Sequence, residues 1–83
     1  MSANGVGMDP KIEKKIGANI RALRERAGLT QEELSAKLQL HGCDITRSAL
    51  AKIEVGQRHL YPDEIILFRA ILDIPFDEIF KIA

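Results

Sequence analysis

Two neighbouring segments in the middle of this 83-residue chain carry side chains whose types could do chemistry. The first holds His41, Cys43 and Asp44, and imidazole, thiolate and carboxylate groups serve as metal ligands and as parts of nucleophilic sites. A zinc site needs a full set of spaced ligands, and His59 is the only other histidine. These residues therefore predict no metal site and no nucleophile, and a turn with a half-buried thiol is the simpler interpretation.

The second segment runs from Thr46 to Glu54 and has the apolar spacing of a short helix. Leu50 and Ile53 are three residues apart, which places them on one face, while Thr46 can cap the start. Gly56 is a typical C-terminal stop. The residues away from the apolar face are short or cationic, which suits a groove better than a core; they are Arg47, Ser48, Ala51 and Lys52. An ordinary amphipathic surface helix is the alternative interpretation.

Helix signals on both sides of this segment predict the elements that hold it. Asp9-Pro10 begins a helix whose apolar stripe runs to about Ala27. Thr30 and Glu33 have the spacing of a capping box, which predicts a second helix from Gln31 to Leu40 or His41. Pro62 begins a fourth helix, apolar around most of its circumference and therefore expected to be buried nearly all round, and Pro75 begins a short fifth. No segment alternates like a strand, so the predicted class is all-α.

Composition limits the possible functions. The net charge is zero, which argues mildly against a nucleic-acid partner, but the charge is polarised. Residues 1–59 contain ten Lys and Arg against seven Asp and Glu, a net +3, and residues 60–83 contain two against five, a net −3. The basic part includes the segment 46–54. No apolar run could span a bilayer, and the single cysteine excludes an internal disulfide, so we expect a cytoplasmic protein.

No motif for an enzyme is present. The glycines form neither a phosphate-binding loop nor a nucleophile elbow. We predict a protein that is not an enzyme, with no metal, no cofactor and no evident small-molecule ligand. Residues 9–83 are expected to form one domain. Residues 1–8 are expected to be a disordered leader, or else residues 1–7 are an expression scar and Met8 is the native start.

Two motifs at their observed separation resemble the phage repressor and Cro-like helix-turn-helix family, often called XRE. They are Leu29-Thr30-Gln31-Glu32-Glu33-Leu34 and Ile53-Glu54-x-Gly56-x-Arg58, and the resemblance covers roughly residues 12–80. It implies a compact, lambda-repressor-like bundle of five helices, whose third helix enters the DNA major groove. One departure is a longer turn between Leu38 and Thr46, found in one branch of the family, which leaves the angle between the second and third helices open. Another is Pro62, where that branch tends to have an acidic cap.

The resemblance implies a sequence-specific transcriptional regulator of the repressor type. Base contacts are expected from the start of the third helix, where Arg47, Ser48 and Lys52 face the bases and Ala49 and Ala51 could touch a thymine methyl. Phosphate contacts are expected from Gln31, Thr46 and Arg58. The alternative is an antitoxin-like or adaptor protein whose main partner is another protein.

Two further expectations concern the assembly of the molecule. The resemblance implies an ion pair between Arg24 and Glu54 that ties the first helix to the end of the third. The apolar C-terminal residues exceed what a small core needs, which predicts a homodimer through Phe76, Ile79, Phe80 and Ile82. A two-fold dimer would place two recognition helices about 34 Å apart on a palindromic operator. The opposing interpretation is that these residues close the core of the monomer.

Overall fold

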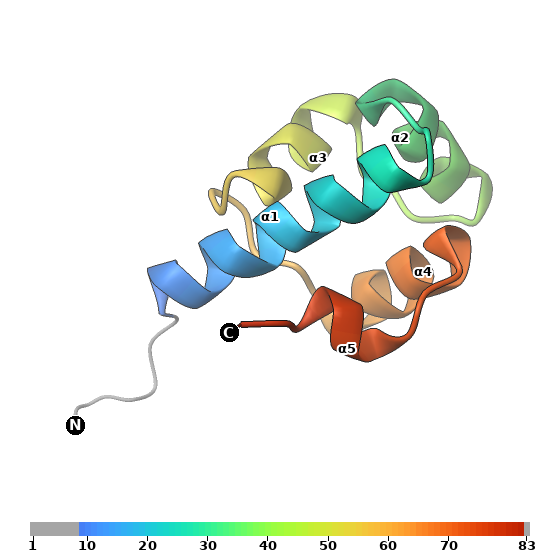
Figure 1. Cartoon of the computed structure of the whole chain (residues 1–83). Helices are drawn as coiled ribbons and strands as arrows, with labels where there is room; N and C mark the ends of the chain where they lie inside the picture. The colour runs from blue at the N-terminus through green and yellow to red at the C-terminus, as the bar shows by residue number, and fades with distance from the viewer. Residues whose placement is uncertain (1–8, 83) are drawn as a thin grey trace.

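The structure, a computed structural model, describes residues 9–82, and that part of the chain contains five helices and no strand (Figure 1). The helices are α1 (Pro10–Arg26), α2 (Gln31–Leu40), α3 (Arg47–Glu54), α4 (Pro62–Leu72) and α5 (Phe76–Ile79). The predicted all-α class with five helices is therefore confirmed. The predictions about a leader and about Met8 as the start lie outside the described residues.

Local capping explains why the helices begin where they do. The Asp9 carboxylate accepts a hydrogen bond from the Lys11 amide at 2.9 Å. In the capping box of α2, Thr30 Oγ1 accepts from the Glu33 amide at 3.0 Å and Glu33 accepts from the Thr30 amide at 2.8 Å. The hydrogen bond that the Thr30 backbone amide donates to the Glu33 carboxylate is the main cause of the lowered pKa of Glu33. Thr46 caps α3 by accepting from the Ala49 amide. The starts expected from the sequence are thus present.

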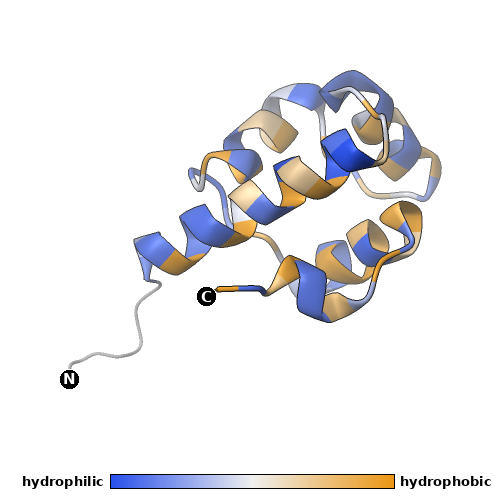
Figure 2. Ribbon diagram, in the orientation of Figure 1, coloured by the Kyte–Doolittle hydropathy of each residue, from blue (hydrophilic) through white to orange (hydrophobic). Residues whose placement is uncertain are grey.

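The core lies between α1 and the other four helices. In Figure 1, α1 crosses the middle of the molecule, with α2 and α3 on one side and α4 and α5 on the other. The apolar faces of the ribbons turn toward this centre (Figure 2). Every helix contributes at least one buried apolar residue; examples are Ile20, Leu34, Leu50, Phe68 and Ile79. The helix that carries the candidate base contacts is therefore held by the same core as the rest of the domain.

The prediction that α4 is buried nearly all round is wrong. Phe68 and Leu72 are buried, but Ile66 is 57% exposed. Within residues 9–82, the other helices pack against the side of α4 that carries Phe68 and Leu72, so its outer face stays at the surface.

The prediction that Ile79 belongs to a dimer surface is also wrong. Ile79 is fully buried and belongs to the core of the monomer. Asn19 of α1 holds this region in place, because its Nδ2 donates to the carbonyls of Ile79 at 2.9 Å and of Lys81 at 2.8 Å. The other three residues of the predicted surface keep exposed fractions of 43%, 42% and 49%; they are Phe76, Phe80 and Ile82.

No helix in the described part of the chain is long and apolar enough to cross a membrane.

Candidate nucleic-acid interface

The exposed face of α3 presents two cations and a hydroxyl to solvent. Arg47, Ser48 and Lys52 are exposed, whereas Leu50 and Ile53 on the opposite face are buried. Among residues 9–82, neither Arg47 nor Lys52 forms an ion pair, while Arg24 and several other arginines do. The α3 surface therefore offers positive charge that no carboxylate of the described chain neutralises.

The two alanines of α3 are less available than expected. Ala49 is partly buried and packs against the hydrophobic core, so only part of its surface is open, and its contact with a thymine methyl stays a prediction. Its position, four residues before the buried Ile53, places it on the side of the helix that faces the core. Ala51 is half-buried and keeps part of its surface open.

The long turn between α2 and α3 is anchored in the core. Ile45 is fully buried and Cys43 is nearly so. The Ile45 carbonyl accepts hydrogen bonds from Ser35 Oγ at 2.7 Å and from Gln39 Nε2 at 3.2 Å. The sequence did not predict these roles of Ser35 and Gln39. Ser35 lies ten residues before Ile45 and Gln39 lies six before it, and no sequence pattern links residues at these spacings.

Cys43 has the character of a structural residue. Desolvation raises the pKa of its thiol, with a further contribution from the carboxylate of Glu64. A thiol with a raised pKa is a poor nucleophile and a poor metal ligand. Within residues 9–82, no group of three His, Cys, Asp or Glu side chains is placed to hold a metal ion.

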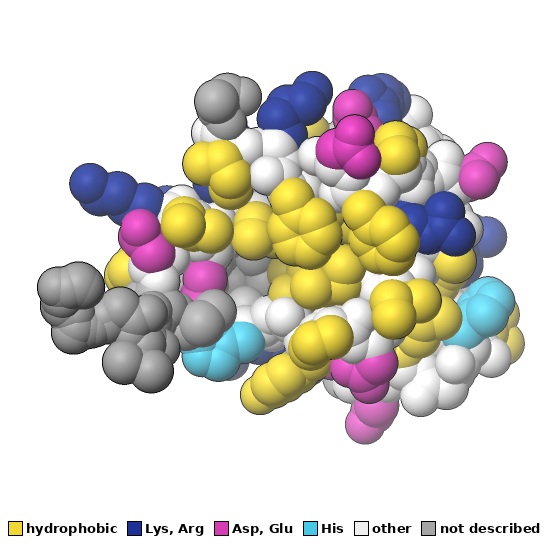
Figure 3. All heavy atoms as spheres, turned by 90° about the horizontal axis from the view of Figure 1, so that it is seen from below, with side chains coloured by type: hydrophobic (Ala, Val, Ile, Leu, Met, Phe, Trp, Pro, Cys, Tyr) yellow, Lys and Arg dark blue, Asp and Glu magenta, His cyan; other side chains and the backbone are white. Residues whose placement is uncertain are grey.

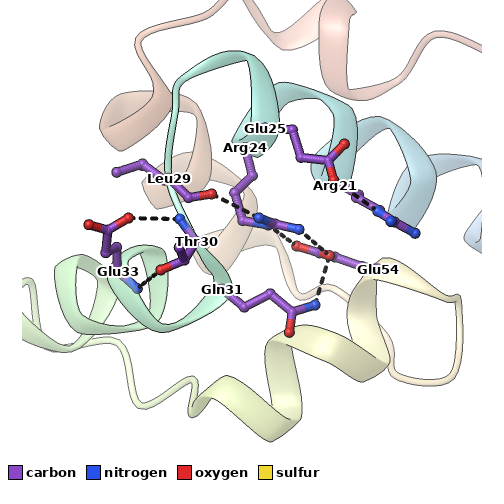
Figure 4. A network of polar contacts seen from close by, with 8 residues as sticks. All are labelled: Arg21, Arg24, Glu25, Leu29, Thr30, Gln31, Glu33 and Glu54. Atoms are coloured by element: carbon purple, nitrogen blue, oxygen red, sulfur yellow. Dashed lines mark hydrogen bonds and ion pairs between the residues drawn. The ribbon is translucent and has the colours of Figure 1, made fainter.

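A buried polar network joins α1, α2 and α3 (Figure 4). Arg24 Nε donates to Glu54 Oε2 at 2.6 Å and Arg24 Nη2 donates to Oε1 at 3.1 Å, so the ion pair that the resemblance implies is present. The hydrogen bond to Glu54 raises the pKa of Arg24. Arg24 Nη1 also donates to the Leu29 carbonyl at 2.8 Å, and Gln31 Nε2 donates to Glu54 Oε1 at 3.0 Å. The network fixes the end of α3 relative to the start of α2.

Two glycines allow the end of α3 to approach α1 closely. A Cβ atom on Gly17 would collide with the carbonyl oxygen of Ile53 and would lie 2.9 Å from that of Glu54. A Cβ on Gly56, which has a φ of +78°, would lie 2.7 Å from the Cα of Lys14. The backbones of α1 and α3 therefore touch at this crossing. The sequence showed Gly56 as a helix stop, but nothing in the pattern of α1 marked Gly17 as a packing residue.

Arg58 occupies a different role from the expected phosphate contact. Its guanidinium binds both carboxylate oxygens of Glu64 at 2.9 and 3.0 Å and donates to the His59 carbonyl. The hydrogen bond to Arg58 lowers the pKa of Glu64, which also accepts from the Tyr61 amide. Arg58 therefore holds the turn before α4, and its contact with a DNA phosphate stays a prediction.

Comparisons with known proteins agree with this geometry. A family model described as helix-turn-helix matches residues 20–79. The fold is similar to a crystal structure of the DNA-binding domain of BldD, with a TM-score of 0.76 and 22% identity, over 88% of this chain and 99% of that one. No curated protein sequence matches this chain.

Proposed function

This chain belongs to the helix-turn-helix family, and we propose that it is a sequence-specific DNA-binding transcriptional repressor that reads the major groove with α3. The observation that carries the proposal is the exposed face of α3, a helix fixed by the core, on which Arg47 and Lys52 form no ion pair with any residue from 9 to 82. The similar fold of the BldD DNA-binding domain supports it.

The roles of individual side chains follow from their surroundings. Arg47 is free to form two hydrogen bonds to one guanine, and Ser48 and Lys52 lie on the same exposed face. The Thr46 hydroxyl accepts from its own helix and still has a proton to donate to a phosphate. Gln31 uses one N–H on Glu54, which leaves its second N–H for the backbone of the DNA.

We further propose that the protein binds DNA as a homodimer on a palindromic operator. Exposed apolar side chains gather on the face shown in Figure 3, and the exposed residues of α4 and the C-terminal region include Ile66, Phe76, Phe80 and Ile82. We call these four residues the apolar patch. It lies in the part of the sequence with a net charge of −3, which would be repelled by phosphate. A second copy would cover this surface and keep the acidic region away from the DNA.

A protein-binding role is the second candidate, and the apolar patch is the observation that favours it. An antitoxin-like or adaptor protein would use this patch for a different protein and would not need the cations of α3. The two functions differ in their response to DNA and to salt.

Binding to genomic DNA fragments, measured by fluorescence polarisation at two salt concentrations, tests the proposal. A sequence-specific regulator should select particular fragments in the presence of competitor DNA, and its affinity should fall steeply as salt rises. Uniform weak binding to all fragments, or none, would favour the protein-binding role.

A further inference from the structure

The carbonyl of Ile45 is the last backbone group before the cap of α3, and two side chains of α2 converge on it. Ser35 Oγ donates to it at 2.7 Å, and Gln39 Nε2 donates to it at 3.2 Å. Gln39 Nε2 also lies 3.3 Å from Ser35 Oγ, so the three groups form one cluster. Ser35 is only 5% exposed, so water does not compete for its hydrogen bond to the Ile45 carbonyl.

The helix itself does not use this carbonyl. The Leu50 amide bonds to the Thr46 carbonyl, and the Ala49 amide bonds to the Thr46 hydroxyl. A backbone carbonyl beside a fully buried side chain such as Ile45 needs a partner from elsewhere. Ser35 and Gln39 supply that partner, and both belong to α2.

The long turn makes this contact important for the direction of α3. The buried side chains of Cys43 and Ile45 hold the turn in the core through apolar contacts, which have no preferred direction. The hydrogen bond from Ser35 adds a directional attachment, one residue before Thr46 and two before Arg47. Together with the core contacts of Leu50 and Ile53, these attachments set the angle between α2 and the start of α3, which the sequence left open.

We propose that Ser35, supported by Gln39, is a positioning residue for base recognition. It orients Arg47 and Ser48 toward the bases and does not itself contact DNA. This inference rests on the proposed function, since it concerns how α3 reads bases. Ser35 is buried in the described structure, with too little exposed surface to contact a duplex. Its influence on sequence preference must therefore pass through the Ile45 carbonyl.

The test compares Ser35→Ala with Ile79→Val, a matched control that removes one buried methylene from α5, away from the turn. Each variant selects its preferred duplexes from a randomised DNA pool, and its affinity is measured for the wild-type duplex and for random DNA. Ser35→Ala should bind the wild-type duplex about fivefold to tenfold more weakly, while affinity for random DNA changes less than about twofold. Its base preference should relax at the positions read by Arg47 and Ser48, whereas Ile79→Val should keep the wild-type preference.

A second measurement separates this inference from the proposed function. Amide hydrogen exchange of residues 46–50 should become faster in Ser35→Ala than in Ile79→Val, whether or not DNA is bound. Gln39→Ala removes an exposed side chain. It should increase the exchange rate of the same amides, and relax the same base preferences, by less than Ser35→Ala does. If Ser35→Ala does not fold, Gln39→Ala replaces it in both measurements. Unchanged exchange and unchanged base preference in these variants would overturn the positioning role. A wild-type protein without any sequence preference would instead overturn the proposed function.

Discussion

Arg47 differs from Arg24 and Arg58 because no carboxylate in the described chain lies in an ion pair with it. We predict that Arg47→Ala weakens binding to the preferred duplex by about 1–3 kcal/mol and relaxes selection at one base position. Polarisation titrations with the preferred and the singly substituted duplexes measure both effects. Lys81→Ala, which removes an exposed cation beside α5, is the control and should bind as the wild type does. Equal weakening on random DNA would make Arg47 a phosphate contact instead.

Glu64 connects the charge of a single residue to the pH dependence of stability. Its pKa is lowered in the folded protein, chiefly by the hydrogen bond from Arg58. Between the lowered pKa and the ordinary pKa, the unfolded chain binds a proton at this position that the folded chain does not. The stabilisation is therefore fully present above the ordinary pKa of a glutamate and is lost as the pH falls through the lowered value.

We predict that Glu64→Gln is less stable than the wild type at pH 7 and loses less stability on acidification. Urea denaturation from pH 7 down to about pH 3 measures the free energy of unfolding of both proteins. Glu32→Gln, on the exposed side of α2, is the control and should follow the wild-type curve. Parallel curves for Glu64→Gln and the wild type would show that the Arg58 contact does not stabilise the fold.

At the scale of the elements, the crossing of α1 and α3 depends on Gly17. At an exposed helix position, Gly→Ala stabilises a protein by about 1 kcal/mol. Here the added methyl group would meet the backbone carbonyls of Ile53 and Glu54, which cannot rotate away as a side chain could. We predict that Gly17→Ala destabilises the domain by about 1–3 kcal/mol, measured by chemical denaturation. A more stable Gly17→Ala protein would show that the two helices do not touch as described.

The Arg24–Glu54 pair joins the same two helices through side chains. Both groups are buried, with exposed fractions of 8% and 4%, so removing one leaves the other without its partner. We predict that Arg24→Met or Glu54→Leu alone costs about 3–5 kcal/mol, and that the double variant costs clearly less than the sum. A double-mutant cycle in urea gives the coupling free energy. Additive losses would mean that the pair does not act as a unit.

The sequence predicted the helices well because their limits are set locally. Thr30 with Glu33, Thr46, and the glycines at 28, 42 and 56 act within a few residues of the helix ends that they determine. Contacts across the fold had no such signal. The close approach of Gly17 to Ile53 depends on how α1 and α3 pack against each other. The hydrogen bond from Ser35 to the Ile45 carbonyl likewise depends on how the turn packs against α2. The ion pair of Arg58 had no local signal either, because its carboxylate partner, Glu64, lies in the next helix.

At the scale of the whole molecule, α1 separates two surfaces with different properties. α3 lies on one side of α1, and α4 and α5 lie on the other (Figure 1). The exposed cations Arg47 and Lys52 belong to α3, whereas the apolar patch belongs to α4, α5 and the residues that follow α5. A domain of this size buries only about 60–65% of its unfolded surface, so a second copy on the patch would also add stability. In a two-fold dimer formed through the patch, the symmetry axis passes through the interface between the two patches. Both copies of α3 can face one duplex only if this axis is perpendicular to the duplex.

The homodimer makes the last prediction. Sedimentation equilibrium at tens of micromolar should give twice the chain mass of 9.3 kDa for the wild type. Phe80→Asp and Ile66→Asp should each shift the mass toward the monomer, because a buried carboxylate on the patch would lose its water without gaining a partner. Leu40→Asp is the control: Leu40 is 84% exposed on α2, outside the patch, and its loss should leave association unchanged. Protection of two half-sites about 34 Å apart by the wild type, and of one by the monomeric variants, would place both copies of α3 on one face of the duplex. A wild-type monomer whose Ile66→Asp variant folds and binds DNA equally well would exclude the dimer and leave the patch to a different partner.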